Sequence, residues 1–257
     1  MKKLFLIVAA MFAAVSFSAC SDDDDNGGKA PTPEKWVKQI VFRAEWDESW
    51  TTTITYDFEN RVKKVDTFLG RDYEFTYNGN SLIVKGSDRT YTCKLNSDGY
   101  VTEVTENDFD KDETYYYKME YKNGYLQRVE ERYSSSEPRI RVSEYTWRDG
   151  NLVEINLLGS EDCDLMEKFF YSETAAPINI NLVYLICQRG GVPDLLGFFG
   201  FCGKQSAKLV SKSDYFNYMN GIEVYSEHNF WNYTFNPDGT VKFMNRGNGN
   251  SILELIY

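Results

Sequence analysis

The chain of 257 residues carries a formal net charge of −11, and 16% of its residues are aromatic, with 19 tyrosines and 17 phenylalanines. An acidic chain without a basic stripe excludes nucleic acid and anionic lipid as its main partners. The aromatic excess favours strands over helices, because tyrosine and phenylalanine suit a pleated, half-buried surface.

Residues 1–19 have the features of a secretory signal peptide. Lys2 and Lys3 give a positive start, and an apolar run from Leu4 to Phe17 follows. A charged start, an apolar stretch of about 7–15 residues and small residues before a cleavage site are typical of such signals. As a helix, this run is also short for a bilayer core of about 30 Å.

The end of this run, Phe17–Cys20, resembles the lipobox of bacterial lipoproteins. The resemblance implies cleavage before Cys20 and lipidation of its thiol, so that the lipid anchor makes the membrane a partner. The alternative is an ordinary signal peptide with an incidental cysteine. The acidic run Asp22–Asp25 resembles the surface-export signal of Bacteroidetes lipoproteins, which implies an outer-membrane lipoprotein exposed on the cell surface; the periplasmic face is the alternative.

Residues 20–35 are expected to form a tether. Its block of like charges repels itself, and the Gly- and Pro-containing stretch that follows has nothing to bury. Residues 36–257, beginning at Trp36, are long enough for a single β domain.

A short motif recurs along this domain: an aromatic-rich alternating run, a polar turn, and two hydrophobic residues three positions apart. Its copies are Ile54–Val65, Tyr91–Val104, Tyr117–Val129, Tyr145–Ile155, Tyr233–Met244 and, more loosely, Tyr73–Leu82. Each copy indicates a β-hairpin, because Asn-Gly or Asp-Gly supplies the positive φ of tight turns. The three-residue step predicts a bulge at the start of the outgoing strand, or a first hydrophobe still in the turn.

A mostly apolar insert, about residues 175–212, interrupts the repeat. A soluble protein does not leave such a stretch in water without a reason. One interpretation is short helical turns that plug the open side of a curved sheet; the other is a lid or docking patch for a ligand or partner. The plug predicts burial of its large side chains, namely Leu182, Leu185, Leu196, Phe198 and Phe199.

The tyrosine-rich hairpins, the lipobox and the end of the insert together resemble a family of Bacteroidetes lipoproteins, a domain of unknown function described as having a porin-like fold. Gly203, Lys204, Ser206 and Leu209 match a short Gly-Lys/Arg-x-Ser-x-x-Leu element of that family. The resemblance brings no catalytic residues. The fold class is predicted to be all-β: an antiparallel meander of hairpins forming a strongly curved sheet or a soluble porin-like barrel, with a short apolar, partly helical insert.

A transmembrane barrel is the competing interpretation, because the chain ends in an apolar strand with a terminal aromatic, Leu253–Tyr257. Against it, the positions predicted to face outward carry charged residues such as Lys63, Glu74, Lys118 and Glu120. A lipid-facing band would be apolar there.

Sequence motifs for catalysis, metals and cofactors are missing. His228 is the one histidine, and no Gly-x-Ser-x-Gly element accompanies it. Asp108–Asp112 begins like a calcium loop but lacks the glycine and glutamate that complete one. The paired carboxylates Glu130–Glu131 and Glu161–Asp162 fit acidic turns as well as a glycosidase. We therefore expect no enzyme, no metal and no cofactor.

The four cysteines after Cys20 are Cys93, Cys163, Cys187 and Cys202, whose spacing matches no zinc site. Either a Cys187–Cys202 bridge or buried thiols would account for them.

Four tryptophans are candidates for a sugar-binding platform, since flat rings stack on the apolar faces of sugars: Trp46, Trp50, Trp147 and Trp231. Core packing is the alternative role for each. We therefore expect a surface-exposed binding or interaction module, for a glycan or an envelope protein. The alternative is a structural or assembly subunit of an outer-membrane complex.

Overall fold

The computed structural model describes residues 36–44, 49–67, 72–133, 140–160, 163–176, 180–186, 194–247 and 251–257. The signal peptide, Cys20 and the tether lie outside these residues, as do Trp46, Glu161–Asp162 and Cys187. The strands are β1 (Gln39–Ala44), β2 (Ser49–Tyr56), β3 (Val62–Asp66), β4 (Tyr73–Asn78), β5 (Ser81–Lys85), β6 (Arg89–Leu95), β7 (Val101–Asp108), β8 (Glu113–Lys122), β9 (Tyr125–Tyr133), β10 (Ile140–Arg148), β11 (Asn151–Ser160), β12 (Cys163–Ala175), β13 (Lys208–Met219), β14 (Ile222–Phe235), β15 (Val241–Arg246) and β16 (Ser251–Ile256). The helices are α1 (Leu182–Ile186) and α2 (Asp194–Phe198).

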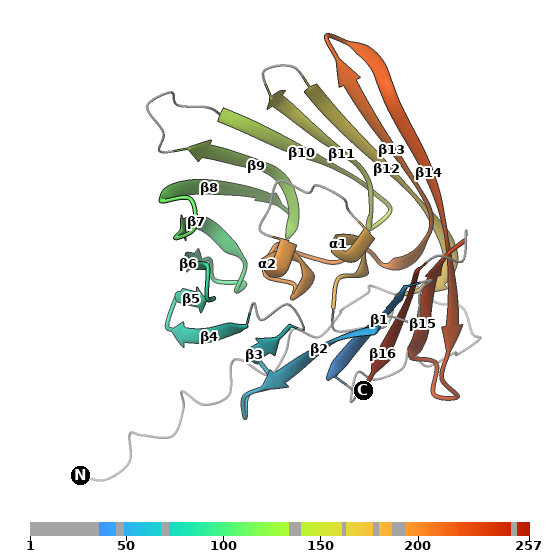
Figure 1. Cartoon of the computed structure of the whole chain (residues 1–257), viewed down its shortest axis with the longest axis horizontal. Coiled ribbons are helices and arrows are strands. Elements are labelled where there is room, and N and C mark those ends of the chain that lie inside the picture. The colour runs from blue at the N-terminus through green and yellow to red at the C-terminus, as the bar shows by residue number, and fades with distance from the viewer. Residues whose placement is uncertain are drawn as a thin grey trace. The chain divides into compact units, whose positions relative to one another are not determined.

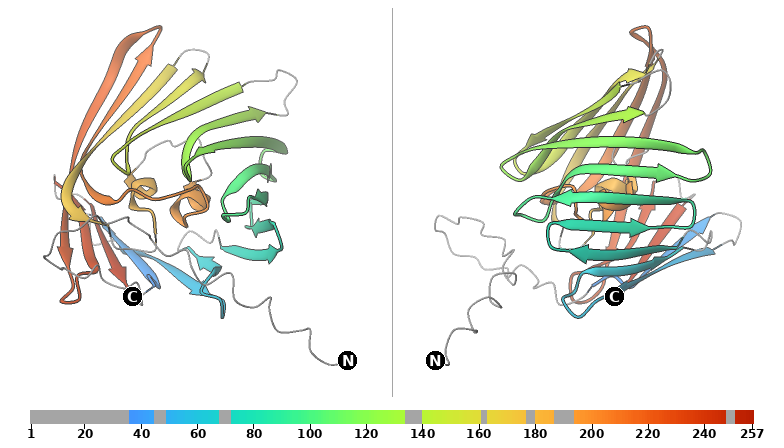
Figure 2. Two further views of the ribbon diagram at one scale, coloured as in Figure 1. Left: turned by 180° about the vertical axis from the view of Figure 1, so that it is seen from behind. Right: turned by 90° about the vertical axis from the view of Figure 1, so that its left-hand side faces the viewer.

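The strands form a closed antiparallel barrel, which confirms the predicted fold class (Figure 1). Each strand pairs with its neighbours in the chain, and β1 closes the ring by pairing with β16, where Ile40 lies opposite Leu255. In Figures 1 and 2 the two helices lie inside the ring of strands. No helix in the described part of the chain is long and apolar enough to cross a membrane.

The period-2 alternation decides which side chains face the interior. On β4, Phe75 is buried and its neighbours Glu74 and Thr76 are exposed, as the sequence predicts. Phe75 lies opposite Val84 of β5, and such inward residues from around the ring form one connected core with the insert. The side chains therefore fill the barrel interior next to the insert.

The predicted bulges are present in the hairpins that carry the three-residue step. Pairing shifts register at Tyr56, Leu95, Tyr121, Trp147 and Phe235, each near the end of an incoming strand. The looser copy, β4–β5, pairs without a shift and turns through two residues. The step in the sequence therefore marks an extra residue in the ladder.

A row of aromatic donors, which we call the aromatic girdle, follows the end of the barrel where these turns lie. Each side chain, near the end of an even-numbered strand or just after it, donates a hydrogen bond to a backbone carbonyl at or near the start of the preceding strand. The pairs are Tyr56–Val37 (2.6 Å), Tyr77–Val62 (2.8 Å), Tyr121–Val101 (2.5 Å), Trp147–Leu126 (2.6 Å), Tyr171–Leu152 (2.6 Å), Tyr233–Val210 (2.8 Å) and Tyr257–Val241 (3.0 Å). Backbone carbonyls withdrawn from water need a donor, so the girdle gives six of the 19 tyrosines a structural role.

The insert plugs this same end of the barrel. Leu182, Leu196 and Phe198 are buried, whereas Leu185 and Phe199 are half-buried, and Phe199 meets Phe75 edge to face with ring centroids 5.7 Å apart. The predicted burial is thus confirmed for three residues and is partial for two. β13 begins at Lys208, earlier than the predicted end of the insert at 212, because irregular pairing beside Tyr171 hides the alternation.

The Gly-Lys-x-Ser-x-x-Leu element attaches the plug to the hairpin turns. The Lys204 amide donates to the Gly124 carbonyl (2.8 Å), and the Ser206 hydroxyl accepts from the Leu152 amide (3.1 Å). Gly203 has a φ of +94°, and a Cβ there would come within 2.7 Å of the Gly124 oxygen. Only glycine fits this close backbone contact.

Candidate functional site

An open pocket of about 610 Å³ lies at the plugged end of the barrel, where the first and last strands meet. Its lining comes from the residues just before β1, the end of β2, the β2–β3 turn and the last residue of the chain: Trp36, Lys38, Ile54, Thr55, Tyr56, Asn60 and Tyr257. This volume is in the range of pockets that hold small ligands, roughly 300–1,000 Å³. We call it the rim pocket.

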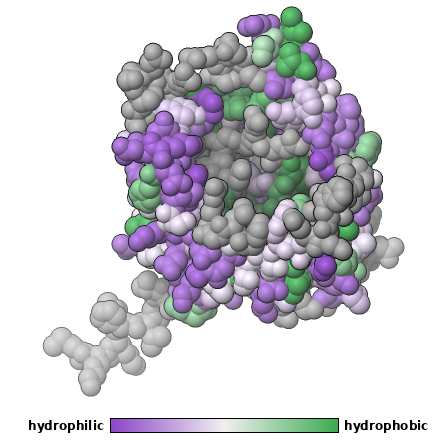
Figure 3. All heavy atoms as spheres, viewed as in Figure 1, coloured by the Kyte–Doolittle hydropathy of each residue, from purple (hydrophilic) through white to green (hydrophobic). Residues whose placement is uncertain are grey.

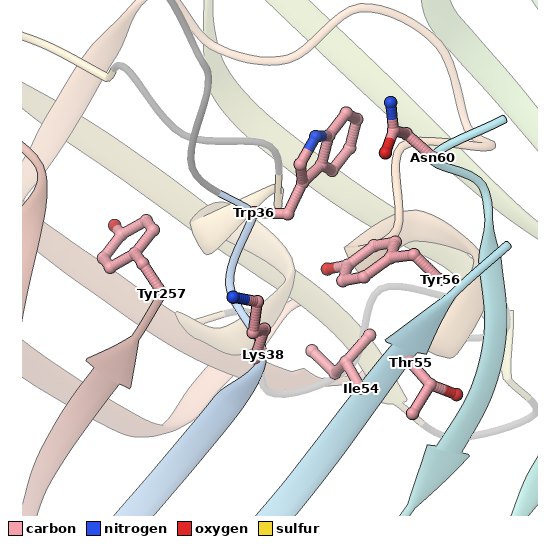
Figure 4. Close-up of a pocket in the computed structure, with 7 residues that line it drawn as sticks. All are labelled: Trp36, Lys38, Ile54, Thr55, Tyr56, Asn60 and Tyr257. Carbon is pink, nitrogen blue, oxygen red and sulfur yellow. The ribbon is translucent and has the colours of Figure 1, made fainter. Parts of the chain in front are cut away.

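Aromatic rings form two sides of the rim pocket. Trp36 and Tyr56 lie with ring centroids 5.3 Å apart at an interplanar angle of 51°, and Tyr257 lies across Lys38 from them (Figure 4). The hydroxyls of Tyr56 and Tyr257 belong to the aromatic girdle, so both rings are held by backbone carbonyls. Burial raises the pKa of Tyr257 to about 12, which keeps its hydroxyl protonated at neutral pH.

The polar groups of the rim pocket are exposed. Lys38, Thr55 and Asn60 supply an ammonium, a hydroxyl and an amide beside the rings. Among the described residues, no carboxylate forms an ion pair with Lys38. Asn60 adopts a φ of +59° in a turn that the Asp57 carboxylate holds by accepting from the amides of Glu59 and Arg61. Rings with an ammonium, an amide and a hydroxyl suit a flat, hydroxylated or anionic ligand.

Of the tryptophans predicted as a platform, the three that the structure describes occupy separate environments. Trp50 stacks on Phe42 with centroids 5.0 Å apart, Trp147 donates to the Leu126 carbonyl, and Trp231 donates to Ser213. The tryptophan of the rim pocket is Trp36, which sequence reasoning treated as the start of the domain. The one signal for Trp36 in the sequence is its place two residues before Lys38, just ahead of the first strand. Only the closure of the barrel brings the end of β16 next to Trp36.

A second group of polar side chains faces the interior at the other end of the barrel. Val101, at the start of β7, donates its amide to the Phe201 carbonyl of the plug, whereas Glu106 and Asp108 lie at the far end of that strand. Arg89 contacts both carboxylates, at 3.0 Å and 3.7 Å. Desolvation by burial raises the pKa of Glu106, although the Tyr117 hydroxyl donates to it at 2.8 Å.

The other residues considered for chemistry have structural partners. Glu131 faces the interior, and burial raises its pKa, whereas Glu130 pairs with Arg128 and Arg132 on the outer wall. His228 lies on β14, with its Nδ1 2.7 Å from Asp214. These side chains act within the wall of the barrel and not in the rim pocket.

The calcium-like sequence forms the β7–β8 turn, in which the Asp108 carboxylate accepts from the amides of Asp110 and Lys111. The described residues contain no group of His, Cys, Asp or Glu side chains suited to a metal ion. Cys93 is a buried thiol whose pKa burial raises to about 12, and Cys202 is also buried. Because Cys187 is outside the described residues, the Cys187–Cys202 bridge stays a prediction.

No protein-family model and no curated protein match the chain. Solved structures that share its fold include two porin-like proteins. One is a porin-like protein from Bacteroides uniformis (TM-score 0.67, 15% identity, 86% of this chain and 97% of that chain). The other is a porin-like protein from Bacteroides vulgatus (TM-score 0.68, 14% identity, 87% of this chain and 99% of that chain). At such low identity the likeness is one of fold: this chain is similar to porin-like barrels of Bacteroides.

Proposed function

We propose that this protein is a lipid-anchored binding module of the bacterial cell surface, and that its rim pocket holds a carbohydrate of the cell envelope. The observation that carries the proposal is the arrangement of Trp36, Tyr56 and Tyr257 around exposed polar groups. The rings would stack on the apolar faces of a sugar, and Lys38 and Asn60 would bind its hydroxyl or carboxylate groups. The lining of this pocket contains none of the four tryptophans predicted as a platform, and the platform stays a separate prediction.

The outer wall of the barrel carries charged side chains, which favours the proposal that this wall faces water. Lys63, Glu74, Lys118 and Glu120 are exposed, as expected from their alternation with buried residues. A wall inside a bilayer would carry an apolar band instead. In this proposal the lipid on Cys20 is therefore the attachment to the membrane, and the porin-like barrel acts as a rigid support for the pocket.

The anchor is tested by the variant Cys20→Ala in the full chain. Without the lipid, the acidic protein has no strong attraction to an anionic surface, so we expect it to leave the membrane fraction. Retention after a high-salt wash would contradict the anchor and favour a spanning barrel or a tightly bound partner.

The pocket is tested by measuring sugar binding. The mature chain is applied to an array of bacterial surface glycans, and each hit is titrated by calorimetry against the wild type, Trp36→Ala and the control Trp50→Ala. We expect Trp36→Ala to lose binding, because it removes one wall of the pocket, and Trp50→Ala to keep it. If no glycan binds above background, or if both variants bind like the wild type, the carbohydrate proposal is wrong.

A further inference from the structure

Along half of β14, the described residues place a strand beside one edge only. β14 pairs with β13 from Ile222 to Phe230, whereas its pairing with β15 begins only at Trp231. Among the described residues, which omit 248–250, no strand pairs with the other edge before that point. In Figure 1 the β13–β14 hairpin accordingly projects past β15.

One hydrogen bond shows which residues of β14 point their N–H and C=O groups toward this edge. The Phe230 carbonyl accepts from the Gly247 amide at 2.7 Å, so Phe230 turns its backbone groups toward β15. Because orientation alternates along a strand, His228 and Ser226 turn their N–H and C=O groups to that same side. An edge of this kind is a template for another strand.

The side chains along this half of β14 are unusually exposed for apolar residues. Ile222 is 69% exposed, Val224 is 52% exposed and Phe230 is 58% exposed. Figure 3 shows apolar residues gathered at the projecting tip of this hairpin. Clustered apolar exposure of this kind marks an interaction surface more often than isolated exposure does.

The charges beside this edge are already compensated. On the outer wall Asp214 contacts His228 and Lys212, and the Lys212 ammonium lies over the rings of Phe170 and Phe230. On the inner face Glu227 pairs with Arg246. From Ser226 to Phe230 an incoming strand would therefore meet no unpaired charge, which fits an uncharged, apolar segment, whereas the exposed carboxylate of Glu223 lies nearer the tip of the hairpin.

We propose that the edge of β14 from Ser226 to Phe230 binds an extended, apolar segment of another envelope protein, which adds to the barrel wall as a further strand. Main-chain hydrogen bonds would supply affinity, and Val224 and Phe230 would contact its alternate side chains. This inference goes beyond the proposed function, because it lies on the barrel wall and requires no sugar.

A second copy of the chain fits this edge poorly. Antiparallel self-pairing turns the two barrels end for end, so the first strands of the two copies would begin at opposite ends of the pair. A two-fold axis at Glu227 would also place two glutamates opposite each other, which is unfavourable. Parallel self-pairing gives no closed two-fold dimer.

The test places a photoreactive benzoylphenylalanine at position 228 of the full, lipidated chain in the cells that make it. The control carries the same group at position 109, because Phe109 is exposed, as His228 is, but lies on a turn. We expect one discrete protein adduct from position 228 and none from position 109. Ser226→Pro should abolish the adduct by removing an edge N–H, whereas Ser226→Ala should preserve it.

Each other outcome overturns the proposal. These outcomes are no adduct at position 228, an adduct that survives Ser226→Pro, an adduct of twice the mass of the chain, or labelled lipid alone. Unchanged thermal melting of Ser226→Pro shows that the barrel remains folded. Because the rim pocket does not involve Ser226, glycan binding by this variant should equal that of the wild type. Failure of one proposal is therefore distinguishable from failure of the other.

Discussion

The two ends of the barrel differ in burial, in charge and in backbone hydrogen bonding. At the plugged end, the insert covers the interior, and hydrogen bonds join the plug to the turns at Val101, Gly124 and Gly150. At the opposite end, Glu106 and Asp108 face the interior around Arg89, and β14 projects with one edge open. The plugged end buries apolar side chains and pairs its backbone groups, whereas the projecting end holds buried charges and an edge of β14 that no strand of the described residues pairs with.

This difference indicates which end contributes most to stability and which end tolerates substitutions. Burial of apolar surface contributes about 25 cal/mol per Å², whereas a buried charge costs free energy unless it is paired. Exposed strand edges are usually blunted or covered. The plugged end therefore serves as the rigid support of the rim pocket, and the projecting end carries features that stability alone does not require.

The largest expected effect is at the centre of the plug. Leu196 has no exposed surface, so Leu196→Ala should lower the free energy of unfolding by about 2–5 kcal/mol. The control Ile222→Ala, at the projecting tip, should change it by less than about 0.5 kcal/mol. Urea denaturation of both variants measures the contrast. Equal effects would contradict the assignment of the insert as a plug. Phe199→Ala should fall between the two, because its ring is half-buried.

A smaller effect is expected in the aromatic girdle. Tyr121→Phe removes the donor to the Val101 carbonyl, which should cost about 1–3 kcal/mol if that oxygen is left without a partner. Tyr116, on the outer face of the same strand, is 48% exposed, so Tyr116→Phe serves as the control with little change. Thermal or urea unfolding measures the stability of both variants. Equal stability would contradict the role of the girdle.

The interior charges of the projecting end should make the stability of the protein depend on pH. Burial raises the pKa of Glu106 above its ordinary value of 4.5, so the folded state binds this proton more tightly than the unfolded chain does. Its contribution to stability is then present in acid and is lost as the pH rises from 4.5 through the raised pKa. Glu106→Gln removes this titration.

We therefore expect Glu106→Gln to lose less stability than the wild type between pH 4.5 and neutral pH. Glu103→Gln is the matched control, because Glu103 lies on the outer side of the same strand and is exposed. Urea unfolding across this pH range makes the measurement. The same pH dependence in the wild type and in Glu106→Gln would show that the carboxyl is not desolvated.

Local signals in the sequence predicted most of the fold. The alternation of Tyr73, Phe75 and Tyr77 specified an inward face, and the step from Val62 to Val65 specified a bulge, because both depend on near neighbours in the chain. The girdle was not predicted, since a bond such as Tyr233–Val210 joins residues that only the strand order brings together. The rim pocket was missed for the same reason: Tyr257 and Trp36 line one pocket only when β16 closes on β1.

The most direct test of the contrast between the two ends is native-state hydrogen exchange of backbone amides. Val101 and Lys204 donate their amides to the plug interface, whereas Ser226 and His228 direct theirs to the open edge of β14. Protected amides exchange only when their hydrogen bonds open, and core amides open with free energies approaching that of global unfolding. The account predicts strong protection at Val101 and Lys204 and rapid exchange at Ser226 and His228. Similar rates at the two ends would contradict it.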